Sequence, residues 1–207
     1  MKRPIPHSSA VRQMYRIKRE FGEKLRTEYE HRAQPCSTCQ TPGACCLDEH
    51  FVNVRITRLE ASAINSVIAE LPDAAAVYSR TAAAIERYDL LGAGSEATYA
   101  CPLFERARGC LVHGPAKPPA CMHHACYESR DDLPPNELLE TIEAEIARLS
   151  RLVHGKDEIG IPLPVAVMQN ASAEHQGRTS AAVRQEISDG TKAVNSSTRL
   201  AGQPPRR

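Results

Sequence analysis

Residues 35–46, PCSTCQTPGACC, and residues 101–126, CPLFERARGCLVHGPAKPPACMHHAC, decide how this chain folds, because together they hold all eight of its cysteines. Each block supplies four thiols, the number that ligates a tetrahedral zinc ion or a cubane iron–sulfur cluster. The sequence therefore predicts a metal centre whose candidate ligands are Cys36, Cys39, Cys45, Cys46, Cys101, Cys110, Cys121 and Cys126.

The spacing within the blocks argues against one ion per block. Cys36 and Cys39 form a Cys-x2-Cys pair, whose two side chains can turn toward the same ion. Cys45 and Cys46 are adjacent, so their side chains diverge and suit two different centres better than one. The second block has the longer spacings Cys-x8-Cys-x10-Cys-x4-Cys. We therefore expect ligands from both blocks to be mixed, which would fasten residues 36–46 onto residues 101–126.

Three common cysteine motifs do not fit these blocks. A zinc ribbon needs two Cys-x2-Cys pairs, and only Cys36 and Cys39 form one. The bacterial ferredoxin run Cys-x2-Cys-x2-Cys-x3-Cys-Pro is absent. A thioredoxin-like motif would start a helix directly after a strand, whereas this pair follows Pro35.

The composition fits one domain of modest size with poorly ordered termini. The chain has 207 residues, is 42% apolar, and contains six Tyr, three Phe and no Trp, so metal–thiolate bonds would support a thin core. The basic N-terminus lacks a following apolar run, and no segment approaches the roughly 20 apolar residues that span a bilayer. We therefore expect no membrane contact and a cytoplasmic location, where clustered cysteines hold metal more often than they form disulfides.

The apolar periodicity predicts four helices. The first covers residues 8–33 and places four arginines opposite its apolar stripe. The second opens with a capping box at Thr57 and Glu60, after a short strand over residues 51–56. The third is capped by Asp73 and runs to about residue 91, and the fourth covers roughly residues 134–153. The second cysteine block is rich in Pro and Gly and is expected to form loops and a short hairpin.

The predicted fold class is mainly α: a small helical domain with short strands and long loops, organised around a cysteine-rich metal centre. Three parts are expected. Residues 1–33 form a basic amphipathic helix, with nine Lys or Arg against four Glu. Residues 34–155 form the cysteine-cluster metal-binding domain. Residues 156–207 form a mostly disordered polar tail, because beyond about residue 169 the chain is rich in Ser, Gly, Gln, Arg and Ala.

The order of motifs resembles the YkgJ-type cysteine-cluster family, also called the CxxCxxCC zinc- or iron-chelating family. The resemblance covers roughly residues 33–127 and rests on CSTC, CC, the VRIT–LEA step, CPLF, GCLVHG and KPPAC. It implies that all eight cysteines serve the metal centre. The chain departs from the family pattern at Val112-His113, Lys117-Pro118 and Met122, none of which removes a cysteine. A similar block occurs in flagellin lysine methylases, where it implies an iron–sulfur cluster.

The irregular spacings, Cys101-Pro102 and the vicinal pair favour a [4Fe–4S] cluster with a redox or sensing role. The alternative is a non-catalytic zinc module that presents a surface to a protein partner. An oxidoreductase or methyl-transfer enzyme that uses the cluster stays open, because no residue pattern identifies a substrate. The substrate, the partner and the oligomeric state are left undetermined by the sequence.

Other polar residues near the blocks have simpler interpretations. His123 and His124 lie between Cys121 and Cys126, so either could replace a thiolate, but a supporting or exposed role is expected for both and for His113. His50 is expected in a solvated turn. Four cations are expected to offset the negative charge of a thiolate centre: Arg55, Arg106, Arg108 and Lys117. The arginine face of the first helix is expected to be solvated, so nucleic acid is not the expected partner: Arg12, Arg16, Arg19 and Arg26.

Overall fold

The computed structural model describes residues 4–34, 38–92, 97–155 and 160–173. It is mainly helical with a few two-stranded sheets, which confirms the predicted fold class at that level. Its contacts separate a compact unit, Met1–Asn170, from the remaining residues. The residues of the predicted N-terminal helix belong to this same unit.

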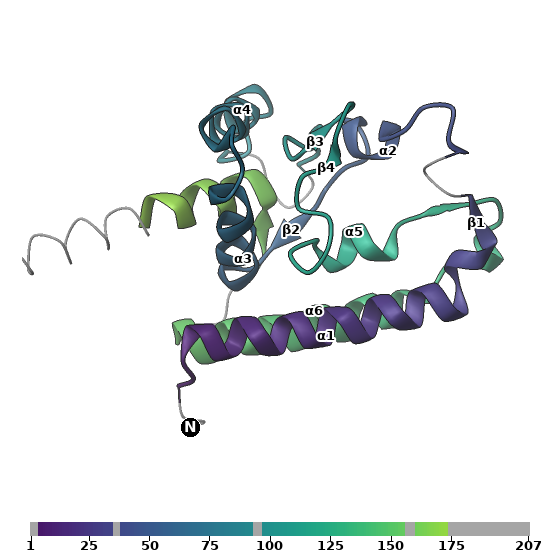
Figure 1. The fold of residues 1–207 in the computed structure, drawn as a ribbon, viewed down its shortest axis with the longest axis horizontal. Helices are drawn as coiled ribbons and strands as arrows, with labels where there is room; N and C mark the ends of the chain where they lie inside the picture. The colour runs from purple at the N-terminus through teal and green to yellow at the C-terminus, as the bar shows by residue number, and fades with distance from the viewer. Residues whose placement is uncertain (1–3, 35–37, 93–96, 156–159, 174–207) are drawn as a thin grey trace, which may run out of the picture. The chain divides into compact units, whose positions relative to one another are not determined.

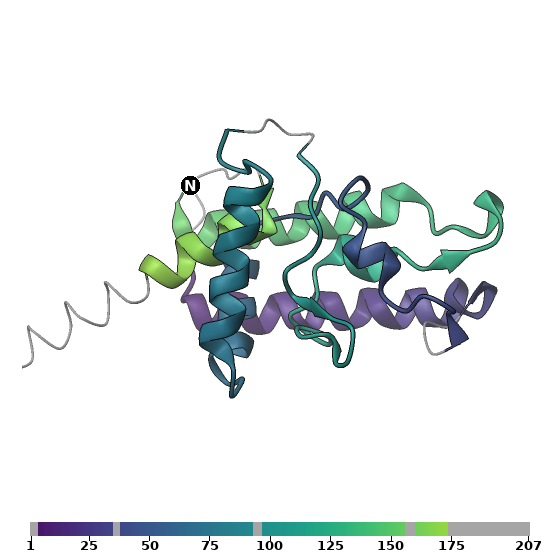
Figure 2. The ribbon, with the colours of Figure 1, turned by 90° about the horizontal axis from the view of Figure 1, so that it is seen from above.

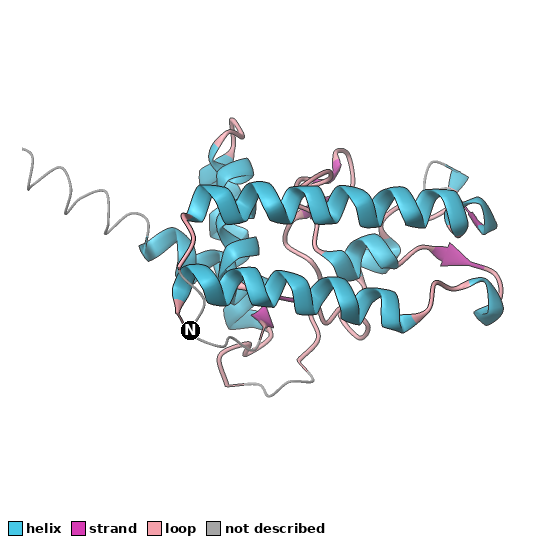
Figure 3. Ribbon diagram, turned by 90° about the horizontal axis from the view of Figure 1, so that it is seen from below, coloured by secondary structure: helices cyan, strands magenta, loops and turns pink. Residues whose placement is uncertain are grey.

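Two long helices form one layer of the unit. Helices α1 (His7–Glu28) and α6 (Asn136–His154) run antiparallel and side by side (Figures 1 and 3). Helix α3 (Arg58–Ala69) packs on both. Apolar residues at helical spacing form the core that joins these three helices: Ala10, Met14, Phe21, Leu25, Leu59, Ala63, Ile142, Ile146 and Leu149.

Helix α3 has a second buried face, which supports another core. Ala61, Ile64 and Ile68 contact apolar residues of α4 (Ala74–Arg87) and of the segments 97–116 and 161–167. Tyr99 lies fully buried in this cluster, and its hydroxyl donates to the Val54 carbonyl. One short helix therefore connects both cores, and Figure 2 shows α4 stacked beside it.

The capping box predicted at the start of α3 is confirmed. The Glu60 backbone N–H donates to Thr57 Oγ1 at 3.3 Å, and the Thr57 N–H donates to Glu60 Oε2 at 3.0 Å. Asp73 precedes α4 as expected but caps nothing with its side chain. Its carboxylate instead pairs with Arg108, from the second cysteine block, at 2.7 Å.

Three pairs of short strands connect distant parts of the chain. Strand β1 (Ala33–Gln34) pairs with β5 (Cys126–Tyr127), β2 (Arg55–Ile56) with β6 (Ile161–Pro162), and β3 (Phe104–Glu105) with β4 (Gly109–Cys110). The first helix ends at Glu28 instead of residue 33, because a 3₁₀ turn, Glu30–Arg32, leads into β1. The strand expected over residues 51–56 is reduced to Arg55–Ile56, the only part opposite β6.

The predicted tail begins too early. Residues 163–173 are helical, and Leu163, Val165 and Val167 are buried in the second core. Asn65 of α3 donates to the Val167 carbonyl at 3.0 Å. Residues 160–170 therefore belong to the folded unit, while residues 174–207 lie outside the described residues.

Candidate metal centre

The two cysteine blocks meet at α2 (Ala44–Leu47), a single turn that carries Cys45 and Cys46. The Cys101 backbone N–H donates to the Cys46 carbonyl at 2.8 Å, which joins the first block to the second. The residue before α2, Gly43, has a φ of 79° and lies against the Phe104 ring of β3. Glycine is required there both by this left-handed backbone and by the close ring.

Four thiols, one from the first block and three from the second, lie within reach of one another's charge. Burial raises the pKa of Cys46 to about 12, and the neighbouring thiols Cys45, Cys121 and Cys110 raise it further. Burial also raises the pKa of Cys121 to about 12, with Cys110 adding to the effect. The pKa of Cys101 rises through burial and then through Cys121, Cys46 and Cys110. These four half-buried thiols form the central thiol group: Cys46, Cys101, Cys110 and Cys121.

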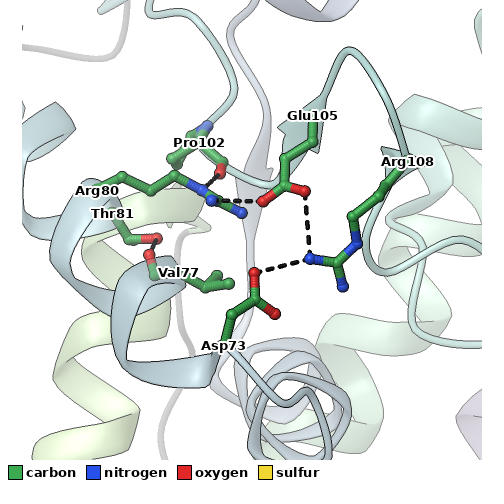
Figure 4. Close-up of polar contacts among 7 residues, drawn as sticks. All are labelled: Asp73, Val77, Arg80, Thr81, Pro102, Glu105 and Arg108. Carbon is green, nitrogen blue, oxygen red and sulfur yellow. Dashed lines mark hydrogen bonds and ion pairs between the residues drawn. The ribbon is translucent and has the colours of Figure 1, made fainter.

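Helix α4 holds the β3–β4 hairpin, which carries Cys110 and closely follows Cys101 (Figure 4). Arg80 of α4 donates to the Pro102 carbonyl and forms an ion pair with Glu105, each at 2.6 Å. Arg108 bridges Glu105 at 3.2 Å and Asp73 at 2.7 Å. Because Pro102 directly follows Cys101, this network fixes the backbone next to a central thiol.

Two lysines act on Cys121 from different sides. Burial raises the pKa of this thiol, whereas the charges of Lys117 and Lys18 lower it. Lys18 is 1% exposed and forms an ion pair with Glu60 at 3.2 Å, in a geometry that is not a hydrogen bond. The two lysine charges favour the Cys121 thiolate, but burial and the Glu60 carboxylate oppose them, so the pKa of this thiol stays raised.

The other cysteines lie outside the central group. Cys45 adjoins Cys46 on α2, and the Cys39 Sγ lies 3.9 Å from Thr41 Oγ1. Cys126 belongs to β5, opposite Gln34. Cys36 falls outside the described residues.

Among the residues that the structure describes, no three His, Cys, Asp or Glu side chains converge closely enough to hold an ion. The central thiols are thus neighbours without metal-bonding geometry. They still supply four sulfur donors. The hydrogen bond between Cys101 and Cys46 and the ion-pair network of α4 hold the backbone beside the group. This donor set has the number and type of atoms that zinc and iron–sulfur clusters take.

The histidines do not join the central group. His123 is buried, and its Nε2 lies 3.3 Å from the Pro135 carbonyl just before α6. His124 is exposed and packs on Phe51 with ring centroids 5.3 Å apart. His50 and His113 are exposed. These positions agree with supporting or solvated roles.

Of the four cations expected near the thiols, only Lys117 acts on them in the described residues. Arg55 donates to the Gly160 carbonyl at 2.8 Å, and Arg108 is held by Asp73 and Glu105. Arg106 is exposed. Backbone and carboxylate partners engage the guanidinium groups of Arg55 and Arg108, and their effect on the thiols stays a prediction.

Sequence reasoning missed Lys18 and Glu60. Lys18 lies four residues after Met14 and seven before Leu25, on the apolar stripe of α1. Glu60 was recognised only for its part in the capping box, although its second carboxylate oxygen reaches Lys18. A lysine in register with a buried stripe is the signal that could have revealed this pair.

Comparison with protein-family models, with curated proteins and with solved structures produced no match for this chain. The resemblance to the YkgJ-type family therefore stays a prediction. Of the helices that the structure describes, none combines the length and apolar character needed to cross a bilayer.

Proposed function

We propose that this chain is a metal-binding cysteine-cluster protein that holds an iron–sulfur cluster, [4Fe–4S], and acts in redox chemistry or sensing. The observation that supports the proposal is the central thiol group, in which Cys46 of the first block neighbours three cysteines of the second. Four thiolates are the ligand set of a cubane cluster. A location in the cytoplasm and membership of the YkgJ-type family go with this proposal.

The electrostatics of the group give a reason for a cation to bind. Burial raises the pKa of each of the four thiols, so their simultaneous ionisation is costly without a compensating positive charge. A metal centre provides that charge, and binding would release the thiol protons. Lys117 would offset part of the negative charge that remains on the thiolates.

When bound, a cubane cluster supplies one-electron redox chemistry. The residues of this chain would hold it and restrict its surroundings. The Cys101–Cys46 backbone hydrogen bond keeps the two blocks in contact, and Arg80 fixes the peptide after Cys101. Because all four thiols are half-buried, the site would be partly screened from water without being sealed.

The test is metal and sulfide analysis with a visible spectrum on protein prepared without oxygen, for the unchanged chain and for two serine variants. We expect iron, acid-labile sulfide and a broad visible absorbance in the unchanged chain. Cys121→Ser should lose most of the iron, whereas Cys39→Ser, outside the central group, should retain it. Equal loss in both variants would contradict the central group as the ligand set.

The non-catalytic zinc module is the competing function, because four thiolates also complete a tetrahedral zinc site. Zinc in a colourless, air-stable protein that unfolds with a chelator would replace the redox proposal by this one. The same pair of serine variants would still identify the ligands. Absence of both metals from protein reconstituted with either would refute metal binding altogether.

A further inference from the structure

A cavity of about 620 Å³ lies between α1 and the segment that leads into α5 (Pro119–His123). Helix α5 packs on α1 at this place (Figure 1). Gly22 is part of the wall, and a Cβ there would meet Met122 Cε at 3.0 Å, so the two helices are already close. The volume falls within the range of cavities that hold small organic ligands.

The cavity is lined by four cations and one carboxylate. Lys18, Arg19 and Arg26 come from α1, Lys117 comes from the second cysteine block, and Glu30 is the acid. Within the described part of the chain, no carboxylate forms an ion pair with Arg19, Arg26 or Lys117. Their charges are therefore available to a ligand.

One of the four cations, Lys18, is buried. Its side chain is 1% exposed, and among the described residues its ammonium has only the ion pair with Glu60 and no hydrogen bond. The Lys18 Nζ atom is itself buried, so a ligand in the cavity would not touch it. Its charge would still attract an anion bound against the Lys18 side chain.

Apolar side chains form another part of the wall, which Tyr15 and His113 also line. Leu25 is buried in the core behind α1, and Pro115 and Met122 face the cavity from the other side. A bare inorganic ion would leave this surface without contact. A ligand with both charged oxygens and an apolar part matches the two kinds of wall.

From these walls we infer a binding site for a small organic oxyanion, one that carries at least two negative charges and an apolar portion. Arg19 and Arg26 supply planar donors that pair with phosphate or carboxylate oxygens, and Lys117 supplies a point charge. The inference uses none of the cysteines as ligands, although Lys117 and Lys18 also act on the Cys121 thiol.

Isothermal titration of the full chain with ATP, succinate and adenosine tests the site. Adenosine is the neutral control for ATP, and comparison of ATP with succinate distinguishes phosphate from carboxylate recognition. We expect saturable binding of at least one anion, no binding of adenosine, and weakening as salt is raised. Absence of saturable binding of both anions at millimolar concentration would overturn the inference.

A matched pair of α1 variants locates the site. Arg26→Gln removes an exposed cation that lines the cavity, whereas Arg12→Gln removes an exposed cation that does not. We expect Arg26→Gln to weaken anion binding about tenfold, as for loss of one charge-assisted hydrogen bond, and Arg12→Gln to leave it unchanged. Equal weakening in the two variants would show general charge attraction and overturn the site. Metal content should be the same in both variants.

Discussion

Gly43→Ala would separate the two cysteine blocks, because the glycine before α2 lies under the Phe104 ring. A Cβ at this position would overlap the ring, and even Cε2, the farthest of three ring carbons, would be only 2.7 Å away. The ring must move, and with it the β3–β4 hairpin that carries Cys110. We therefore expect loss of both stability and metal binding from one added methyl group.

The structure allows the cost to be divided into two parts. An alanine in the left-handed conformation costs about 1 kcal/mol, since φ is 79° at this residue. Displacing a half-buried phenylalanine by overpacking adds about 1–3 kcal/mol. The expected loss of unfolding free energy is about 2–4 kcal/mol, a large share of the 5–15 kcal/mol typical of a domain.

Gly109 provides the matched control. Its φ is 78°, nearly that of Gly43, but a Cβ there would meet nothing within 4 Å. Gly109→Ala should therefore cost only the conformational part, about 1 kcal/mol. Urea denaturation of both variants measures the difference, and Gly43→Ala combined with Phe104→Ala should recover part of it. Equal destabilisation of the two single variants would refute the role assigned to the Phe104 ring.

Three further predictions concern buried groups. Lys18→Met should lower the free energy of unfolding by about 3–5 kcal/mol, because it leaves the Glu60 carboxylate buried and unpaired. Adding Glu60→Gln should restore most of this stability in thermal unfolding, and no recovery would contradict the ion pair. Folding raises the pKa of Cys46 and Cys121 from 9.0 to about 12, so their contribution to stability is complete below about pH 9 and is lost as pH rises toward 12. Metal-free protein should then need less urea to unfold at about pH 10.5 than at about pH 8, and the opposite order would refute the sign. Truncation after residue 155 should abolish cooperative unfolding, because it removes four buried apolar residues, Leu163, Val165, Ala166 and Val167, whereas a chain that ends at residue 173 keeps them. Burial of the leucine and of each valine is worth roughly 1.5–3 kcal/mol.

Local sequence signals predicted the helices that position the candidate site. The apolar stripes of α1 and α6 and the Thr57–Glu60 capping box are contained in neighbouring residues, and each formed as expected. These features need no knowledge of the rest of the chain. The predicted approach of the two cysteine blocks likewise corresponds to an observed contact, the hydrogen bond between Cys101 and Cys46.

Features that depend on distant partners could not be predicted in the same way. Ile161–Pro162 becomes a strand only because Arg55–Ile56 lies beside it, and the segment after it contains Pro164, which suggests a loop. Lys18 reads as a surface charge until Glu60 is placed opposite. The central thiol group is also non-local, since cysteine spacing does not say which thiols share a neighbourhood.

The contact between Cys46 and the second block has a consequence for how the protein is made. Cys46 and Cys121 are 121 − 46 = 75 residues apart, so at 5–20 residues per second the ribosome completes the group about 4–15 s after the first thiol is synthesised. Until Cys101 is synthesised, 101 − 46 = 55 residues after Cys46, the nascent chain carries none of the second-block thiols. The vicinal pair of Cys45 and Cys46 is exposed to oxidants before its partners exist, so a reducing environment matters most during translation. A metal centre that requires all four thiols can be inserted only after that interval.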